Sequence, residues 1–125
     1  MKTNMFEQHN EHTEWLKKLS FFADEFTIMQ KRLEEISAKN NGAEILKEIE
    51  HFQNQFIIQR RSLDELSRRI KSGEKQLMSS ISDNPIASDH RKAEDHAVER
   101  EQMESLEKVF NELRKEFASF LSKRM

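Results

Sequence analysis

Cysteine is absent from this 125-residue sequence, and glycine and proline are scarce, with two glycines and one proline. Without cysteine the chain has no disulfide, no thiolate nucleophile and no cysteine-bound zinc, and we expect a cytoplasmic location. The scarcity of glycine and proline disfavours a sheet protein with many turns. Long apolar runs are missing too, so we expect a soluble protein without a signal peptide or a membrane span.

Neither sign of charge dominates the chain. Lys and Arg number 21 and Asp and Glu number 23, which leaves a formal net charge of -2. No overall field therefore attracts nucleic acid or an acidic membrane surface. Basic residues concentrate over 60–75, but the acidic residues over 89–104 are predicted to lie beside them and to neutralise them by pairing. We therefore expect neither a nucleic-acid partner nor a membrane partner.

Apolar residues at helical spacing are what the sequence has in abundance. They recur three and four positions apart along 4–40, 42–82 and 85–123, which predicts three long amphipathic helices. A helix of about 38 residues is roughly 57 Å long and needs partners of similar length on its apolar faces. The predicted core positions are Gln8, His12, Trp15, Leu19, Phe22, Phe26, Met29, Leu33 and Ile36; then Ile45, Ile49, Phe52, Phe56, Leu63, Leu66, Ile70 and Leu77; then Met103, Leu106, Phe110, Leu113, Phe117 and Phe120. The first half of the third helix offers only Ala93, Ala97 and Val98.

Two short polar segments separate the three helices. Asn40 to Gly42 tolerate the left-handed backbone of a helix C-cap, and Asn41 is predicted to cap the second helix. Asn84 is predicted to cap the third helix, with Pro85 at its first position. Short turns between helices of similar length predict one all-α domain over residues 1–125, a long antiparallel up-down-up three-helix bundle with coiled-coil-like packing.

Histidine placement is the sharpest chemical feature of the sequence. Four of the five histidines fall at the end of the predicted bundle that holds the N-terminus and the second turn, namely His9, His12, His90 and His96. His12 and His96 are predicted to lie at the level of Gly73, and Glu99 shares a helix face with His96. Zinc, iron and manganese accept mixed histidine and carboxylate ligands. The candidate metal ligands are therefore His12, His96 and Glu99, with His9 as an additional candidate.

The same pattern has a simpler interpretation, which the sequence favours. Helix ends are hydrated, and His and Glu on a polar surface need no ion. A di-iron site of the ferritin type is excluded, because Glu48 and His51 have the Glu-x-x-His spacing but no second copy faces them. His51 is instead predicted to lie beside Phe52 and to bond a neighbouring helix. No strand-turn-helix elbow or glycine loop positions a nucleophile, so we predict no catalytic residue and no enzyme.

Two further features bear on partners. Gln59 interrupts the apolar line of the second helix, either as a buried amide that specifies register or as part of a surface row of amides. Four apolar residues exceed what one apolar seam requires, namely Phe21, Ile28, Ile57 and Ile58. Either the three helices enclose them or they form a homodimer contact, and we predict self-association.

Three stretches resemble a family of small bacterial helical proteins of uncharacterised function: HFQNQFIIQ at 51–59, EHTEWL at 11–16 and FNELRKEFASFLSKRM at 110–125. The resemblance extends along the chain and implies a helical fold, and no known activity is attached to it. The tryptophan early in the first helix is also similar to that of a spectrin-type repeat, a likeness of fold that carries no function. We expect a non-catalytic interaction or scaffold protein without a cofactor, with a protein partner or a second copy of itself. The alternative is a metal-binding bundle that holds a divalent ion at its histidine-rich end.

Overall fold

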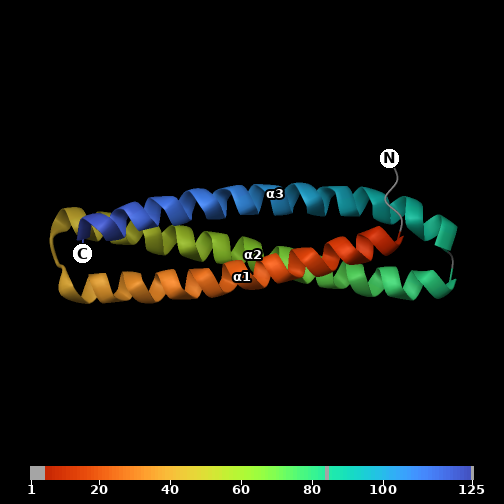
Figure 1. Cartoon of the computed structure of the whole chain (residues 1–125), viewed down its shortest axis with the longest axis horizontal. Helices are drawn as coiled ribbons and strands as arrows, with labels where there is room; N and C mark the ends of the chain where they lie inside the picture. The colour runs from red at the N-terminus through yellow and green to blue at the C-terminus, as the bar shows by residue number, and fades with distance from the viewer. Residues whose placement is uncertain (1–4, 84, 125) are drawn as a thin grey trace.

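Three long α-helices make up the structure, a computed structural model that describes the backbone of residues 5–83 and 85–124 and the side chains of 5–79 and 95–124. Helix α1 spans Met5–Lys39, α2 spans Ala43–Asp83 and α3 spans Pro85–Arg124. The helices lie side by side and alternate in direction, so the start of α1 lies near the end of α2 and the start of α3 (Figure 1). The predicted all-α antiparallel three-helix bundle is confirmed.

The turn between α1 and α2 differs from the prediction. No described residue has a positive φ, so the predicted left-handed cap does not form there. The Asn40 side chain instead donates a hydrogen bond of 2.8 Å to the Ile36 carbonyl and satisfies an end group of α1. The Leu46 amide donates to the Gly42 carbonyl at 3.0 Å, which makes Gly42, rather than Asn41, the N-cap residue of α2. The predicted cap at Asn84 lies outside the described residues.

The predicted core positions of all three helices are buried. The centre of the hydrophobic core holds Phe26 and Phe56, each 0% exposed, and Phe110, which is 1% exposed. The Phe26 ring stands edge-on to Phe110 at 5.4 Å between centroids, and Phe22 stacks on Phe110 at 4.3 Å. Such aromatic pairs contribute about 0.5–1.5 kcal/mol each beyond the area they bury. Packing between aromatic rings thus holds the helices together in the apolar half of the bundle.

Polar side chains continue the core line at the other end. The expectation that Ala97 and Val98 face the core in the first half of α3 is wrong, because both side chains are exposed. His96 and Glu99 are buried instead, at 2% and 3% exposure. They lie seven and four positions before Met103, so the core face of α3 continues unbroken at helical spacing while its chemistry changes from apolar to polar. The Ala93 side chain lies outside the described residues.

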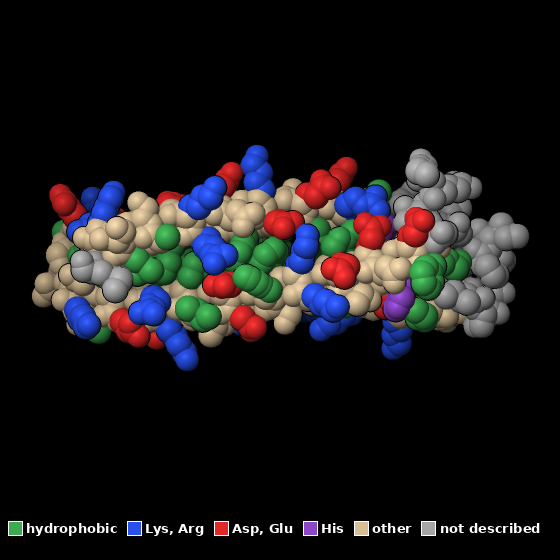
Figure 2. All heavy atoms as spheres, viewed as in Figure 1, with side chains coloured by type: hydrophobic (Ala, Val, Ile, Leu, Met, Phe, Trp, Pro, Cys, Tyr) green, Lys and Arg blue, Asp and Glu red, His purple; other side chains and the backbone are tan. Residues whose placement is uncertain are grey.

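The additional apolar residues are not enclosed by the helices. Phe21, Ile28, Ile57 and Ile58 are 41%, 53%, 46% and 50% exposed. Apolar side chains also form a visible band in the seam between α1 and α3, flanked by charged groups (Figure 2). Gln59 is half-buried rather than fully buried, and it lines a groove of about 500 Å³ between α2 and α3.

The charge pairing predicted between the basic residues over 60–75 and the acidic residues over 89–104 has one example among the described residues, Arg69 with Glu99 at 3.9 Å. Other pairs join different positions, such as Arg124 with Glu48 at 2.8 Å and Lys18 with Glu107 at 3.5 Å. Among the residues that the structure describes, no helix contains a stretch that is both long and apolar enough to cross a membrane.

Candidate metal centre

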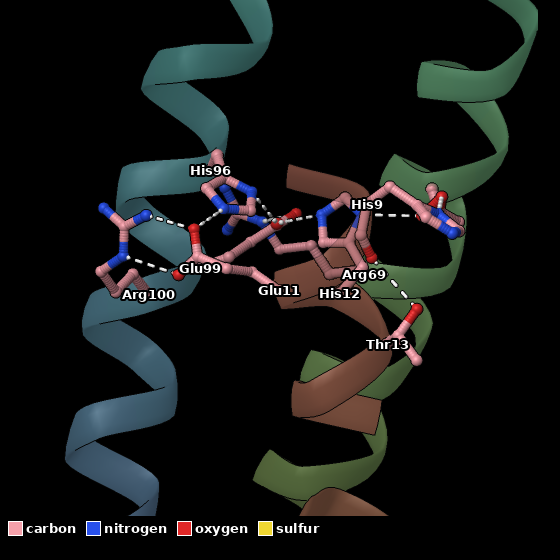
Figure 3. Close-up of polar contacts among 9 residues, drawn as sticks. His9, Glu11, His12, Thr13, Arg69, His96, Glu99 and Arg100 are labelled. Carbon is pink, nitrogen blue, oxygen red and sulfur yellow. Dashed lines mark hydrogen bonds and ion pairs between the residues drawn. The ribbon is translucent and has the colours of Figure 1, made fainter. Parts of the chain in front are cut away.

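Each of the three helices contributes to a buried polar cluster at the histidine-rich end. Helix α1 supplies His12, and α3 supplies His96 and Glu99 (Figure 3). Gly73 of α2 lies beside them. One nitrogen from each histidine and one Glu99 oxygen all lie within 4.8 Å of one another. These are the three residues that the sequence offers as candidate metal ligands, and the antiparallel register brings them together from positions 84 and 87 residues apart.

His12 lies between two carboxylates. Its Nδ1 is 3.1 Å from Glu74 Oε2, and its Nε2 is 3.3 Å from Glu99 Oε2. Since both acceptors are carboxylate oxygens, both ring nitrogens donate when the imidazole is protonated. Burial disfavours the charged ring, but the hydrogen bonds and charges of Glu99 and Glu74 outweigh burial and raise the pKa of His12. In the absence of an ion, His12 is therefore the more readily protonated histidine of this cluster.

His96 has the opposite character. Its Nε2 donates a hydrogen bond of 2.9 Å to Glu11 Oε1. Burial is the largest effect and lowers the pKa of His96, because the hydrogen bond and charge of Glu11 do not fully compensate for it, while His12 and Arg100 add like charge. A neutral His96 with its proton on Nε2 carries a lone pair on Nδ1. That Nδ1 is buried and has no hydrogen-bond partner among the described residues.

The carboxylate that bonds His96 is itself held by an arginine. Arg100 donates through its NH2 group to Glu11 Oε1 at 2.6 Å and through Nε to Oε2 at 3.2 Å. Burial raises the pKa of Glu11, but the hydrogen bonds from Arg100 and His96 outweigh burial and lower that pKa overall. An ionised Glu11 fixes the orientation of the His96 ring and keeps its Nδ1 turned toward Glu99, which lies 3.9 Å away.

Gly73 provides the space for this cluster. A Cβ at this position would lie 3.2 Å from Glu99 Oε1 and 3.8 Å from His12 Cε1. The first distance is shorter than an ordinary contact, so any larger residue would push the Glu99 carboxylate away from His12. Gly73 needs no unusual backbone conformation, since no described glycine has a positive φ. The sequence prediction that His12 lies at the level of Gly73 agrees with this contact geometry.

Trp15 closes the cluster on the side of the apolar core. Its ring stacks on His96 with 4.7 Å between centroids and a 27° angle, and it lies 5.8 Å from the His12 ring. The two imidazoles are 5.1 Å apart. A stacked indole limits rotation of the His96 ring and excludes water from one side of the cluster, which strengthens every electrostatic interaction inside it.

The spacing of these groups suits a small divalent cation. Zinc bonds histidine nitrogen and carboxylate oxygen at about 2.0–2.2 Å, so neighbouring ligand atoms of a tetrahedral site lie about 3.3 Å apart. The distance from His12 Nε2 to Glu99 Oε2 is 3.3 Å, and that from His96 Nδ1 to the same oxygen is 3.9 Å. Small side-chain rotations would bring the three atoms onto one ion. The outer nitrogens bond Glu74 and Glu11, as the outer nitrogens of metal-bound histidines do.

His9, the additional candidate, is not one of the three converging residues. Its Nδ1 bonds Glu74 Oε1, on the carboxylate that also holds His12. His9 therefore supports the cluster from outside. The His90 side chain lies outside the described residues. Sequence reasoning missed Glu74 and Glu11, although each adjoins a residue that it singled out, Gly73 and His12.

His51 lies at the opposite end of the bundle and is separate from this cluster. Its Nε2 bonds Glu116 Oε1 at 2.9 Å, and its ring stands edge-on to Phe52 at 5.0 Å. Both contacts agree with the prediction of a flanking histidine bonded to a neighbouring helix. Because 46% of its side chain is exposed, His51 offers a natural comparison for the buried histidines.

Comparisons with models of protein families, with curated proteins and with solved structures return no match to this chain.

Proposed function

We propose that this protein is a non-catalytic helical bundle that binds a divalent metal ion through His12, His96 and Glu99. The observation that carries the proposal is the His96 ring, whose Nε2 is bonded to Glu11 while its buried Nδ1 faces Glu99 without a hydrogen-bond partner among the described residues. An unpartnered buried acceptor costs about 1–3 kcal/mol. A bound ion would remove that cost.

Metal binding would also change the role of His12. The ion takes the place of the proton on Nε2, while Nδ1 keeps its bond to Glu74. One ligand comes from α1 and two come from α3, so the ion joins two helices at the end where the core is polar. Apolar burial contributes least to stability at this end. An ion that joins α1 to α3 there would add its binding free energy to the folded state. The proposed role is thus metal-dependent ordering of this half of the bundle.

The direct test is a thermal melt of metal-free protein with and without Zn²⁺, Fe²⁺ or Mn²⁺, combined with metal analysis of the purified protein. A free ion concentration of 100 times the Kd stabilises the folded state by about 2.7 kcal/mol. For a chain of this size that corresponds to a rise of about 10 °C in Tm. The variant His12→Ala with His96→Ala should lose the shift.

The matched control is His51→Ala, which removes a histidine that also bonds a carboxylate but lies at the far end. This variant should keep the full metal-dependent rise in Tm. The absence of a shift in the unsubstituted protein would refute the proposal and leave the cluster as a hydrogen-bonded polar core. An equal shift in the double variant would refute the assignment of the ligands.

Self-association is a second candidate function, as an interaction or scaffold protein whose partner is another copy of the chain. The exposure of Phe21, Ile28, Ile57 and Ile58, between 41% and 53%, supports it, because the helices do not enclose these residues. Each large apolar side chain removed from water contributes about 1.5–3 kcal/mol when fully buried. An exposed set of this kind is what a contact between copies would cover.

Light scattering over a range of protein concentrations tests this candidate. A dimer at high micromolar concentration that Ile58→Glu converts to a folded monomer would support it. A monomer throughout that range would refute it. If Ile58→Glu unfolded the chain instead, the role of Ile58 would be internal packing.

A further inference from the structure

We infer that an ion bound at His12, His96 and Glu99 keeps one exchangeable coordination position, and that a small monoanion such as a carboxylate occupies it from the adjoining cleft. The inference rests on the proposed metal site. It adds the chemical class of a ligand that the bundle would hold together with the ion.

The number of protein ligands is the first observation. Within the described residues, three side chains converge with ligand atoms close enough to share an ion, and Glu74 and Glu11 are engaged by the outer histidine nitrogens. Zinc sites with four protein ligands are closed, whereas sites with three leave a position for water or another ligand. The cluster at this end of the bundle has three such side chains, so an ion there would keep a position for water or another ligand.

A cleft beside the cluster gives access to that position. It has a volume of about 210 Å³ and is lined by all three candidate ligands together with Arg69, Ser72 and Asp95. Since one water molecule takes about 30 Å³ of the liquid, the cleft has room for several waters or for a small organic anion. Gly73 also lines it, and the missing side chain there keeps the path between Glu99 and the cleft open.

Arg69 identifies the class of anion. Its Nε is 3.9 Å from Glu99 Oε1, beyond hydrogen-bond distance, so the guanidinium keeps donor capacity toward the cleft. Guanidinium groups bind carboxylates through paired hydrogen bonds, and Ser72 adds a hydroxyl to the same lining. Asp95 is exposed and also lines the cleft, so its charge disfavours anions of higher charge. Together these residues favour a small monocarboxylate over a phosphate.

The experiment uses the full chain loaded with Co²⁺, whose visible absorption reports its coordination. The first step tests the metal site alone: a Co²⁺ spectrum that is absent, or unchanged in His12→Ala with His96→Ala, refutes the proposed function. The second step adds acetate to the Co²⁺ protein. A saturable change in the spectrum is expected, with an apparent affinity for acetate at least tenfold weaker in Arg69→Gln, which retains the metal ligands.

Several results would overturn the inference while leaving the metal site intact. A Co²⁺ spectrum that acetate does not change in the parent protein would mean that the fourth position is closed. If acetate then changed the spectrum only in Asp95→Asn, that position would belong to Asp95. Equal acetate affinity in the parent and in Arg69→Gln would show that the anion does not bind beside Arg69. A stronger response to phosphate than to acetate would refute the assigned class.

Discussion

Replacing Gly73 by Ala tests whether the space beside α2 is reserved for Glu99. Glycine inside a helix is less favourable than alanine by about 1 kcal/mol, so this substitution on its own should stabilise the bundle. The new Cβ would lie 3.2 Å from Glu99 Oε1, so the carboxylate must move by a few tenths of an ångström. Its hydrogen bond to His12 is already long at 3.3 Å and would break. Loss of a buried hydrogen bond costs about 1–3 kcal/mol.

We therefore expect Gly73→Ala to leave the free energy of unfolding unchanged or to lower it by up to about 2 kcal/mol. The matched background is Glu99→Ala, in which the carboxylate is gone and the new methyl group has room. There the same glycine substitution should stabilise the protein by about 1 kcal/mol. The difference between the two backgrounds is a coupling energy of about 1–3 kcal/mol between Gly73 and Glu99.

Urea unfolding of the four proteins in this cycle, in metal-free buffer at one pH, measures the coupling. The four proteins are the parent, the two single variants and the double variant. If Gly73→Ala stabilises the parent and the Glu99→Ala protein equally, Glu99 does not occupy the space that the missing side chain leaves. The polar cluster would then have a different packing from the one described, and the three candidate ligands would not meet beside Gly73.

Three further predictions concern stability. Phe110→Ala should cost about 3–5 kcal/mol in urea unfolding, whereas His51→Ala, which breaks an exposed pair, should cost about 0.5 kcal/mol; equal losses would contradict a core centred on the phenylalanines. The raised pKa of His12 gives metal-free protein stability that is full below its ordinary value of 6.5 and lost as pH rises through the folded pKa, so His12→Gln should flatten that decline. The lowered pKa of His96 acts in the opposite sense, because the unfolded state then binds more protons: stability should fall as pH drops from 6.5 to the folded pKa, and His96→Gln should remove this decline.

Periodicity by itself determined the architecture. Apolar residues three and four apart predict three amphipathic helices, and the polar segments at 40–42 and at 84 separate them, so the up-down-up order and the core positions follow from local spacing. The same register predicted that His12, His96 and Glu99 would meet near Gly73, because antiparallel helices of known rise fix which residues share a level. Helix periodicity thus placed the three candidate residues at one level of the bundle.

Only the tertiary structure decided which hydrogen-bond partners these residues have and how the pKa values of the two histidines differ. Spacing could not show that Glu74 and Glu11 hold the outer nitrogens of the two histidines, since side-chain directions between helices depend on packing. Nor could it show that the pKa of His12 is raised and that of His96 lowered, because the pKa of each depends on burial and on partners 62 to 87 residues away. The first half of α3 was misjudged for a related reason. An apolar count overlooks polar residues that continue a core face, and only the assembled bundle provides the partners that make their burial tolerable.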